Sequence, residues 1–262
     1  MMDAKPSALR IEHLRVSFRT GKRSQMAVED VSLEVKPGQI VALVGESGSG
    51  KSVTAMAAMG LIDPPGQIED GDIWLGDRNL STYSERQLQQ IRGREIAIIF
   101  QDPVNALNPV INIGKQLMES VRQHRRVSAQ EAKRLALSQM QQVGLARPQA
   151  LFHQYPFQIS GGMCQRVMIA MALLAGANLL IADEPTTALD VTIQAQILKE
   201  LDRVRRQQGM SMLLITHDLG VVAELADYVY VMREGRIVEQ GDVYEIFAAP
   251  RHAYTKYLLE CR

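Results

Sequence analysis

The chain has 262 residues, long enough to bury a substantial core as one domain or as a domain with an inserted lobe. Lysine plus arginine and aspartate plus glutamate number 29 each, so the composition disfavours a nucleic-acid-binding protein, which normally has a basic face. There is no signal-peptide core, no apolar window long enough to span a bilayer, and no metal-binding spacing of Cys164 and Cys261. We therefore expect a soluble protein of a reducing cytoplasm, whose membrane role must come through a partner.

Strand-like and helix-like segments alternate along the chain, which predicts an α/β architecture with a largely parallel sheet. Residues 9–18 alternate as a half-buried strand, and residues 27–35 are a second predicted strand. Pro37 and Gly38 then turn the chain into residues 39–45, an apolar run typical of a buried central strand. A helix to about Leu61 follows, and further strands are predicted at 95–100, 178–183, 211–216 and 228–232.

The middle of the chain has a different pattern. No strand is evident from about Pro103 to Pro156, and Ser128 with Glu131 forms a predicted capping box at a helix start. We interpret residues 103–160 as a helical lobe inserted into the α/β core. Two later helices are predicted, one over 163–174 and one that begins near 191 and ends with Gly209 as its C-cap.

The sequence GESGSGKS fits the pattern G-x-x-x-x-G-K-[ST], between a predicted strand and a predicted helix. In such a loop, glycines let backbone N–H groups surround phosphates, a lysine contacts the β/γ oxygens, and a serine hydroxyl ligates Mg²⁺. A glycine-rich turn without a ligand is the alternative. The predicted nucleotide-binding residues here are Gly45, Glu46, Ser47, Gly48, Ser49, Gly50, Lys51, Ser52 and Val53.

Polar side chains follow three other predicted strands, at the edge where ligands bind in parallel sheets. Asp183 is a candidate Mg²⁺ ligand, and Glu184 is a candidate base that orients or deprotonates the attacking water. His217 is a candidate γ-phosphate contact, although a lone histidine is more often structural. Gln101 is placed to reach Mg²⁺ or water, although alone it would be an ordinary loop residue.

A second anion site is predicted at Ser160, Gly161 and Gly162, which open the helix over 163–174. Free backbone N–H groups and little side chain at such a helix start favour an anion. One chain therefore carries two predicted phosphate sites.

In chain order, the phosphate loop, Gln101, ISGGM, LLIADE, Asp190 and His217 resemble the nucleotide-binding subunits of ATP-binding cassette (ABC) transporters, over nearly the whole chain. The resemblance implies an ABC-cassette fold: a RecA-like core sheet with an N-terminal antiparallel β-subdomain (1–102 and 161–262) and an inserted helical subdomain (103–160). It also implies that ATP and Mg²⁺ are bound, and that two cassettes pair head to tail. Ser160–Gly162 of one chain would then cap the γ-phosphate held by the other, which explains the two phosphate sites.

Further roles follow only from the resemblance. Phe18 corresponds to an aromatic residue that stacks on adenine, although a strand phenylalanine is more often core. Asp190 corresponds to an aspartate that communicates across the dimer, and the segment 102–114 to a surface that receives a helix of the membrane subunit. Ile159, Met163 and Cys164 depart from the usual signature residues, which leaves open how well this signature supports turnover of the partner's ATP.

Finer features resemble the peptide/nickel group of bacterial importers. Because the chain stops at Arg262 and has YPF before the signature, we favour nickel or metal-chelate import, with di-/oligopeptide import as the alternative. In that group we expect a heterodimer with a second ATPase subunit, two membrane permeases, an extracytoplasmic solute-binding protein and a peripheral place on the cytoplasmic side of the inner membrane. A cytosolic cassette ATPase of DNA repair or translation, a P-loop kinase and a degenerate regulatory cassette are weaker alternatives.

Overall fold

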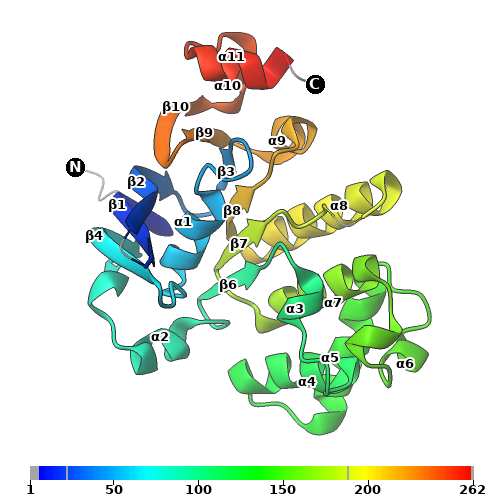
Figure 1. Cartoon of the computed structure of the whole chain (residues 1–262). Helices are drawn as coiled ribbons and strands as arrows, with labels where there is room; N and C mark the ends of the chain where they lie inside the picture. Colours follow the sequence, from blue (N-terminus) through cyan, green and yellow to red (C-terminus); the bar gives the residue numbers. More distant parts are fainter. Residues whose placement is uncertain (1–5, 22, 188, 261–262) are drawn as a thin grey trace. The chain divides into compact units, whose positions relative to one another are not determined.

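The computed structural model describes residues 6–21, 23–187 and 189–260. Ala188, two residues before Asp190, lies outside these residues, as do Cys261 and Arg262. The chain forms two compact units, residues 1–92 with 209–262, and residues 93–208 (Figure 1). The predicted helical insertion at 103–160 lies within the second unit, and its separation as a subdomain stays a prediction.

The first unit contains a mixed sheet in the order β5-β4-β1-β2-β10-β9-β3-β8. The strands β1, β2 and β4 pair in antiparallel fashion, whereas β3 pairs in parallel with both β8 and β9. Their bounds are β1 (Leu9–Thr20), β2 (Arg23–Val35), β3 (Ile40–Val44), β4 (Gly66–Leu75), β5 (Arg78–Asn79), β8 (Ser211–Ile215), β9 (Tyr228–Arg233) and β10 (Arg236–Asp242).

The parallel strands β3 and β8 are buried along their whole length, because neighbouring elements cover them, and this explains their unbroken apolar sequences. The strands β4 and β10 were not predicted. Both carry mostly polar, partly exposed residues and lack the apolar pattern that marks a strand in sequence. The helices of this unit are α1 (Lys51–Ala58), α2 (Glu85–Ile91), α9 (Leu219–Leu225), α10 (Val243–Ala248) and α11 (Ala253–Glu260), with a 3₁₀ turn at Leu80–Thr82.

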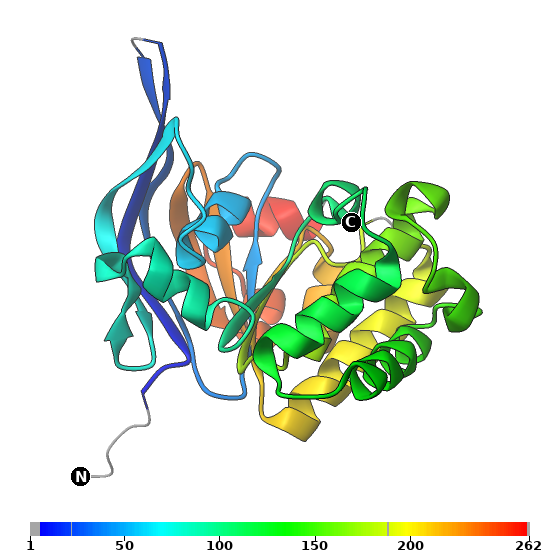
Figure 2. The same ribbon diagram turned by 90° about the horizontal axis from the view of Figure 1, so that it is seen from below.

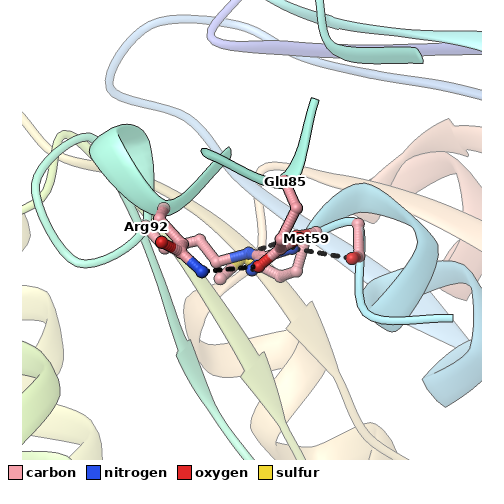
Figure 3. A network of polar contacts seen from close by, with 5 residues as sticks. Met59, Glu85 and Arg92 are labelled. Carbon is pink, nitrogen blue, oxygen red and sulfur yellow. Dashed lines mark hydrogen bonds and ion pairs between the residues drawn. The ribbon is translucent and has the colours of Figure 1, made fainter. Parts of the chain in front are cut away.

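Helix α1 ends at Ala58, three residues before the predicted end. The carbonyl oxygens of Met59 and Gly60, which follow it, accept hydrogen bonds from Arg92 Nε (2.8 Å) and Nη2 (2.7 Å). Arg92 Nη1 also donates to Glu85 Oε1 at 2.6 Å. Figure 3 shows Arg92, Glu85 and Met59 together. The hydrogen bond from Arg92 holds the pKa of Glu85 below its ordinary value. A side chain after α2 therefore closes the C-terminal end of the helix that begins with Lys51.

The second unit contains two parallel strands, β6 (Ile96–Ile99) and β7 (Leu179–Asp183), and a group of helices. Helices α4, α5 and α7 pack on one another (Figure 2). The bounds are α3 (Pro103–Ala106), α4 (Ile113–His124), α5 (Ala129–Gln142), α6 (Pro148–Leu151), α7 (Gly161–Ala175) and α8 (Val191–Gln208), with a 3₁₀ turn at Pro156–Gln158. Gly209 follows α8 directly with φ 65°, as predicted for its C-cap.

The predicted capping box of α5 forms on one side. Ser128 Oγ accepts the hydrogen bond of the Glu131 N–H at 3.2 Å, as predicted. The Glu131 carboxylate is bound by Arg134 at 2.7 and 2.9 Å, one turn further along the same helix. An arginine at this spacing is a stronger partner for a carboxylate than a backbone N–H. Within the described part of the chain, no helix is both long and apolar enough to cross a bilayer.

Candidate functional site

The phosphate loop connects the buried strand β3 to α1, as predicted. Gly50 has φ 106° and lies so close to β2 that a Cβ would be 2.5 Å from the Ala27 carbonyl oxygen. No side chain fits there, and an L-residue would also be strained. The last glycine of the motif is therefore required by the close approach of the loop to β2.

Lys51 is almost fully buried at the start of α1. Its Nζ donates hydrogen bonds to the carbonyl oxygens of Gly45 (2.8 Å) and Glu46 (2.9 Å), so the loop wraps around the ammonium group. A buried ammonium group surrounded by backbone of a Gly-rich loop is a ready counter-charge for phosphate oxygens. Ser52, the next residue, is partly exposed and offers a hydroxyl oxygen.

A distant residue also supports the loop. The Glu46 N–H donates to the hydroxyl oxygen of Tyr254 on α11 at 2.9 Å. Tyr254 is 4% exposed and belongs to an apolar cluster that includes Val44, Val231 and Ile246. Burial raises the pKa of the Tyr254 hydroxyl, and a lone pair of its oxygen accepts this hydrogen bond. Sequence reasoning did not find Tyr254 as a loop contact.

His217 lies at the same sheet edge as the phosphate loop. In the parallel pair of β3 and β8, Leu43 is opposite Ile215, and Gly45 and His217 each follow two residues later. The imidazole is exposed, and Asp218 behind it caps α9 by accepting from the Gly220 N–H at 2.8 Å. The edge therefore presents an imidazole beside a phosphate loop, as the sequence predicted.

Phe18 is half-buried on β1, opposite Gly66 of β4. A Cβ on Gly66 would lie 2.7 Å from Phe18 Cε1, so the phenyl ring lies across this glycine. Phe18 is not fully buried, and stacking on an aromatic base requires an accessible ring face.

In the second unit, the acidic pair lies at the end of β7. Asp183 is its last residue and is 5% exposed, whereas Glu184 is partly exposed. Ala182 is opposite Ile99 of β6, and Glu184 and the exposed Gln101 each follow two residues after this pair. The structure therefore brings Asp183, Glu184 and Gln101 to one edge of this unit.

The backbone at Glu184 has φ 48°, in the left-handed region that non-glycine residues rarely adopt. Thr187 Oγ1 donates a hydrogen bond to Glu184 Oε2 at 2.8 Å. The carbonyl oxygen of the next residue, Pro185, accepts a hydrogen bond from Gln165 Nε2 of α7 at 2.9 Å. Backbone strain persists only where surrounding contacts fix it, and it gathers at functional sites. Gln165 and Thr187 were not found from the sequence.

Ser160 is the N-cap of α7, and its Oγ accepts from the Met163 N–H at 3.3 Å. Ser160 and Gly161 are exposed, and a Cβ on Gly161 would meet nothing within 4 Å. The helix start is thus open to an anion that arrives from outside this unit.

Three residues, Ile159, Met163 and Cys164, depart from the usual signature, and their burial shows where these side chains lie. Cys164 is 1% exposed, its thiol donates to the Pro156 carbonyl oxygen at 3.6 Å, and burial raises its pKa. The side chain therefore packs inward as an unreactive thiol. Met163 and Ile159 are partly buried. Asp190 caps α8, because its Oδ1 accepts from the Ile193 N–H at 3.0 Å.

Comparison with known proteins agrees with this geometry. The sequence profile described as ABC transporter matches residues 28–187. The chain is 49% identical over 252 residues to the oligopeptide transport ATP-binding protein OppD of Bacillus subtilis, which covers 96% of this chain and 70% of OppD. The chain is also 49% identical over 257 residues to the glutathione import ATP-binding protein GsiA of Salmonella typhimurium. This match covers 96% of this chain but only 41% of GsiA. The chain thus spans less than half of that second relative.

Among solved structures, the dimeric ABC transporter cassette MJ0796 has a TM-score of 0.82 at 24% identity, and the match covers 90% of this chain and 98% of the other. This likeness confirms the predicted cassette fold. With the family profile and OppD, it leaves no support for a P-loop kinase. The chain belongs to the ABC transporter family, as an ATPase that couples ATP hydrolysis to transport.

Proposed function

We propose that this chain energises the import of di- or oligopeptides through a bacterial ABC importer. The observation that carries the proposal is its 49% identity to OppD over 96% of its own length. The name of GsiA, for a peptide-like cargo, favours the same class of solute.

Nickel or metal-chelate import, the substrate favoured in the sequence analysis, has less support than its peptide alternative. The YPF segment used for it is a local surface feature: the rings of Tyr155 and Phe157 stack at 5.6 Å, and Phe157 is 72% exposed. The relatives described above are named for oligopeptides and glutathione, and none of these names contains a metal.

For nucleotide binding, we assign Gly45–Val53 to the phosphates of ATP and Phe18 to the adenine ring. The buried ammonium group of Lys51 is the main counter-charge. For Mg²⁺, we assign Ser52, Gln101 and Asp183 as ligands, because hydroxyl, amide and carboxylate oxygens are donors that this ion prefers. When bound, the ion would neutralise charge on the β- and γ-phosphates.

For hydrolysis, we assign Glu184 as the base that orients water for in-line attack and accepts its proton on the carboxylate. His217 contacts the γ-phosphate and Gln101 contacts the water. The hydrogen bond from Thr187 to Glu184 Oε2 limits the directions that the carboxylate can take. A carboxylate held in this way is pre-organised for the reaction.

For assembly, we propose that Ser160–Gly162 caps the γ-phosphate held by a second ATPase subunit, with Asp190 near the dimer contact. The open start of α7 supports this role. The complex includes two permease subunits and an extracytoplasmic solute-binding protein. The chain would lie on the cytoplasmic side of the inner membrane and act as one half of a heterodimer.

The experiment is uptake of a labelled tripeptide by a host strain that lacks the gene. We expect uptake to fall, and to be restored by the wild-type gene and by a Lys36→Ala control, an exposed lysine outside the loop. Lys51→Ala should not restore it. Nickel accumulation in low-nickel medium is measured in the same strains. Normal tripeptide uptake with reduced nickel would replace the peptide proposal by the metal one.

A further inference from the structure

Gln165 is a buried amide in α7, with 0% of its surface exposed. Its Nε2 donates to the carbonyl oxygen of Pro185 at 2.9 Å. Pro185 directly follows Glu184, so a side chain of α7 holds the backbone immediately after the proposed base. The same helix carries Ser160 at its N-cap.

Stability alone does not explain an amide at this position. Gln165 Oε1 is buried and has no hydrogen-bond partner among the described residues. An unpaired buried acceptor is unfavourable, and a methionine would fill a similar space without Oε1, although it would also leave the Pro185 carbonyl without the Gln165 donor. The contact with Pro185 is therefore what a glutamine provides here and an apolar side chain does not.

The backbone that Gln165 holds is the strained one. Glu184 has φ 48°, and such a conformation is kept only where neighbouring contacts determine it. Residues before Glu184 are held in the fully buried strand β7. After Glu184, the Pro185 carbonyl is held by Gln165, and Thr187 holds the carboxylate.

We propose that Gln165 is a positioning residue for ATP hydrolysis, which sets the direction of the Glu184 carboxylate through the Pro185 carbonyl. The inference rests on the proposed role of Glu184 as the base. It also makes the helix that starts at Ser160 part of the support of the base, because Gln165 lies about one turn into that helix.

The first test is Gln165→Met in the assembled transporter. We expect little change in Tm, because Gln165→Met removes the unpaired Oε1 and keeps the space filled but also removes the donor of the Pro185 carbonyl, so the two effects oppose each other. The Kd for ATP should be unchanged. We expect kcat for ATP hydrolysis to fall about tenfold, a fraction of what misplacement of a reacting group by 1 Å can cost. Gln139→Met, a partly buried glutamine of α5, is the matched control and should keep the wild-type kcat.

The second test is Gln165→Glu over a range of pH. A protonated carboxyl group can donate to the Pro185 carbonyl, whereas a carboxylate cannot, and burial raises the pKa of a carboxyl group. At the acid end of the range, Gln165→Glu should therefore have a higher kcat than Gln165→Met. The ratio of Gln165→Met to wild type should not change with pH, since methionine does not titrate.

Three outcomes would overturn the inference: a wild-type kcat in Gln165→Met, a kcat loss matched by losses of Tm and ATP affinity, or a Gln165→Glu variant no better than Gln165→Met at low pH. The variant Glu184→Gln distinguishes a wrong role of Gln165 from a wrong assignment of Glu184 in the proposed function. If Glu184→Gln keeps near-normal turnover, the base assignment is wrong. If it loses turnover and Gln165→Met does not, only the role of Gln165 is wrong. In the double variant, we expect no loss beyond that of Glu184→Gln, since both act on one group.

Discussion

The phosphate loop and the acidic turn after β7 are both irregular segments at strand ends, but they are held in different ways. The loop is shaped by backbone contacts: Gly50 lies against a carbonyl of β2, and loop carbonyls surround Lys51. The acidic turn is held by side chains, through the amide of Gln165 and the hydroxyl of Thr187.

This difference predicts how each segment responds to substitution. In the phosphate loop, a side chain added at Gly50 would overlap the backbone of β2 and should destabilise the loop. The acidic turn should keep its backbone conformation when one side-chain contact is lost. The orientation of the Glu184 carboxylate should then be less well fixed. Substitutions in the loop should therefore lower stability and binding, and those in the turn should lower turnover.

The largest effect is expected for Glu184→Gln in the acidic turn, and it should be a loss of ATP turnover. ATP affinity should remain, because the amide keeps the shape and an oxygen that accepts from Thr187. Turnover should fall at least about a hundredfold, the scale of lost acid–base assistance. Single-turnover hydrolysis and equilibrium ATP binding on the same preparation measure both quantities. Near-normal turnover would contradict the assignment.

Gly50→Ala in the phosphate loop should lower the stability of the protein. Backbone strain and the overlap with the Ala27 carbonyl together should lower the free energy of unfolding by about 3 kcal/mol. Calorimetric unfolding checks this value. Gly48→Ala is the matched control, because Gly48 has φ 81° but open space where a Cβ would be, so only the strain remains. Equal losses in the two variants would show that the overlap relaxes at no cost.

Tyr254→Phe sharpens the comparison, because this loop contact comes from a side chain. The ring and its packing stay, while the Glu46 N–H loses its acceptor, at a cost of about 1 kcal/mol. We expect ATP to bind about fivefold more weakly, the same energy expressed as affinity, with kcat unchanged. Isothermal titration is the measurement, and Tyr244→Phe, an 82% exposed tyrosine of α10, is the control. A loss of kcat without a loss of affinity would place Tyr254 among the turnover residues.

The smallest effect is expected at Glu85, away from both segments. Because Arg92 lowers the pKa of Glu85 in the folded protein, this pair stabilises the fold above the unfolded-state pKa. That contribution is lost as the pH falls through the lowered folded-state pKa. The difference in Tm between wild type and Glu85→Gln should therefore shrink as the pH is lowered from neutrality into the acid range. A constant difference would contradict the shift.

The two segments also differ in how far sequence could predict them. The phosphate loop is contiguous, so eight successive residues were enough to place it between β3 and α1. The strand that leads to Glu184 was predicted from its apolar residues, yet the contacts of the turn were not. Gln165 lies 20 residues from Pro185, and only the packed structure brings them together. Likewise, β4 and β10 have mostly polar sequences. They are strands because they pair with neighbouring strands, and their own residues do not predict this.

The contact between Glu46 and Tyr254 has a consequence for synthesis of the chain. The two residues are 208 positions apart, so the phosphate loop leaves the ribosome long before its support. At about 5–20 residues per second, the delay is on the order of 10–40 s. During that time the Glu46 N–H can bond only to water or to other parts of the nascent chain. A premature stop before α11 would therefore release a chain whose phosphate-loop sequence is intact but whose loop lacks the support of Tyr254.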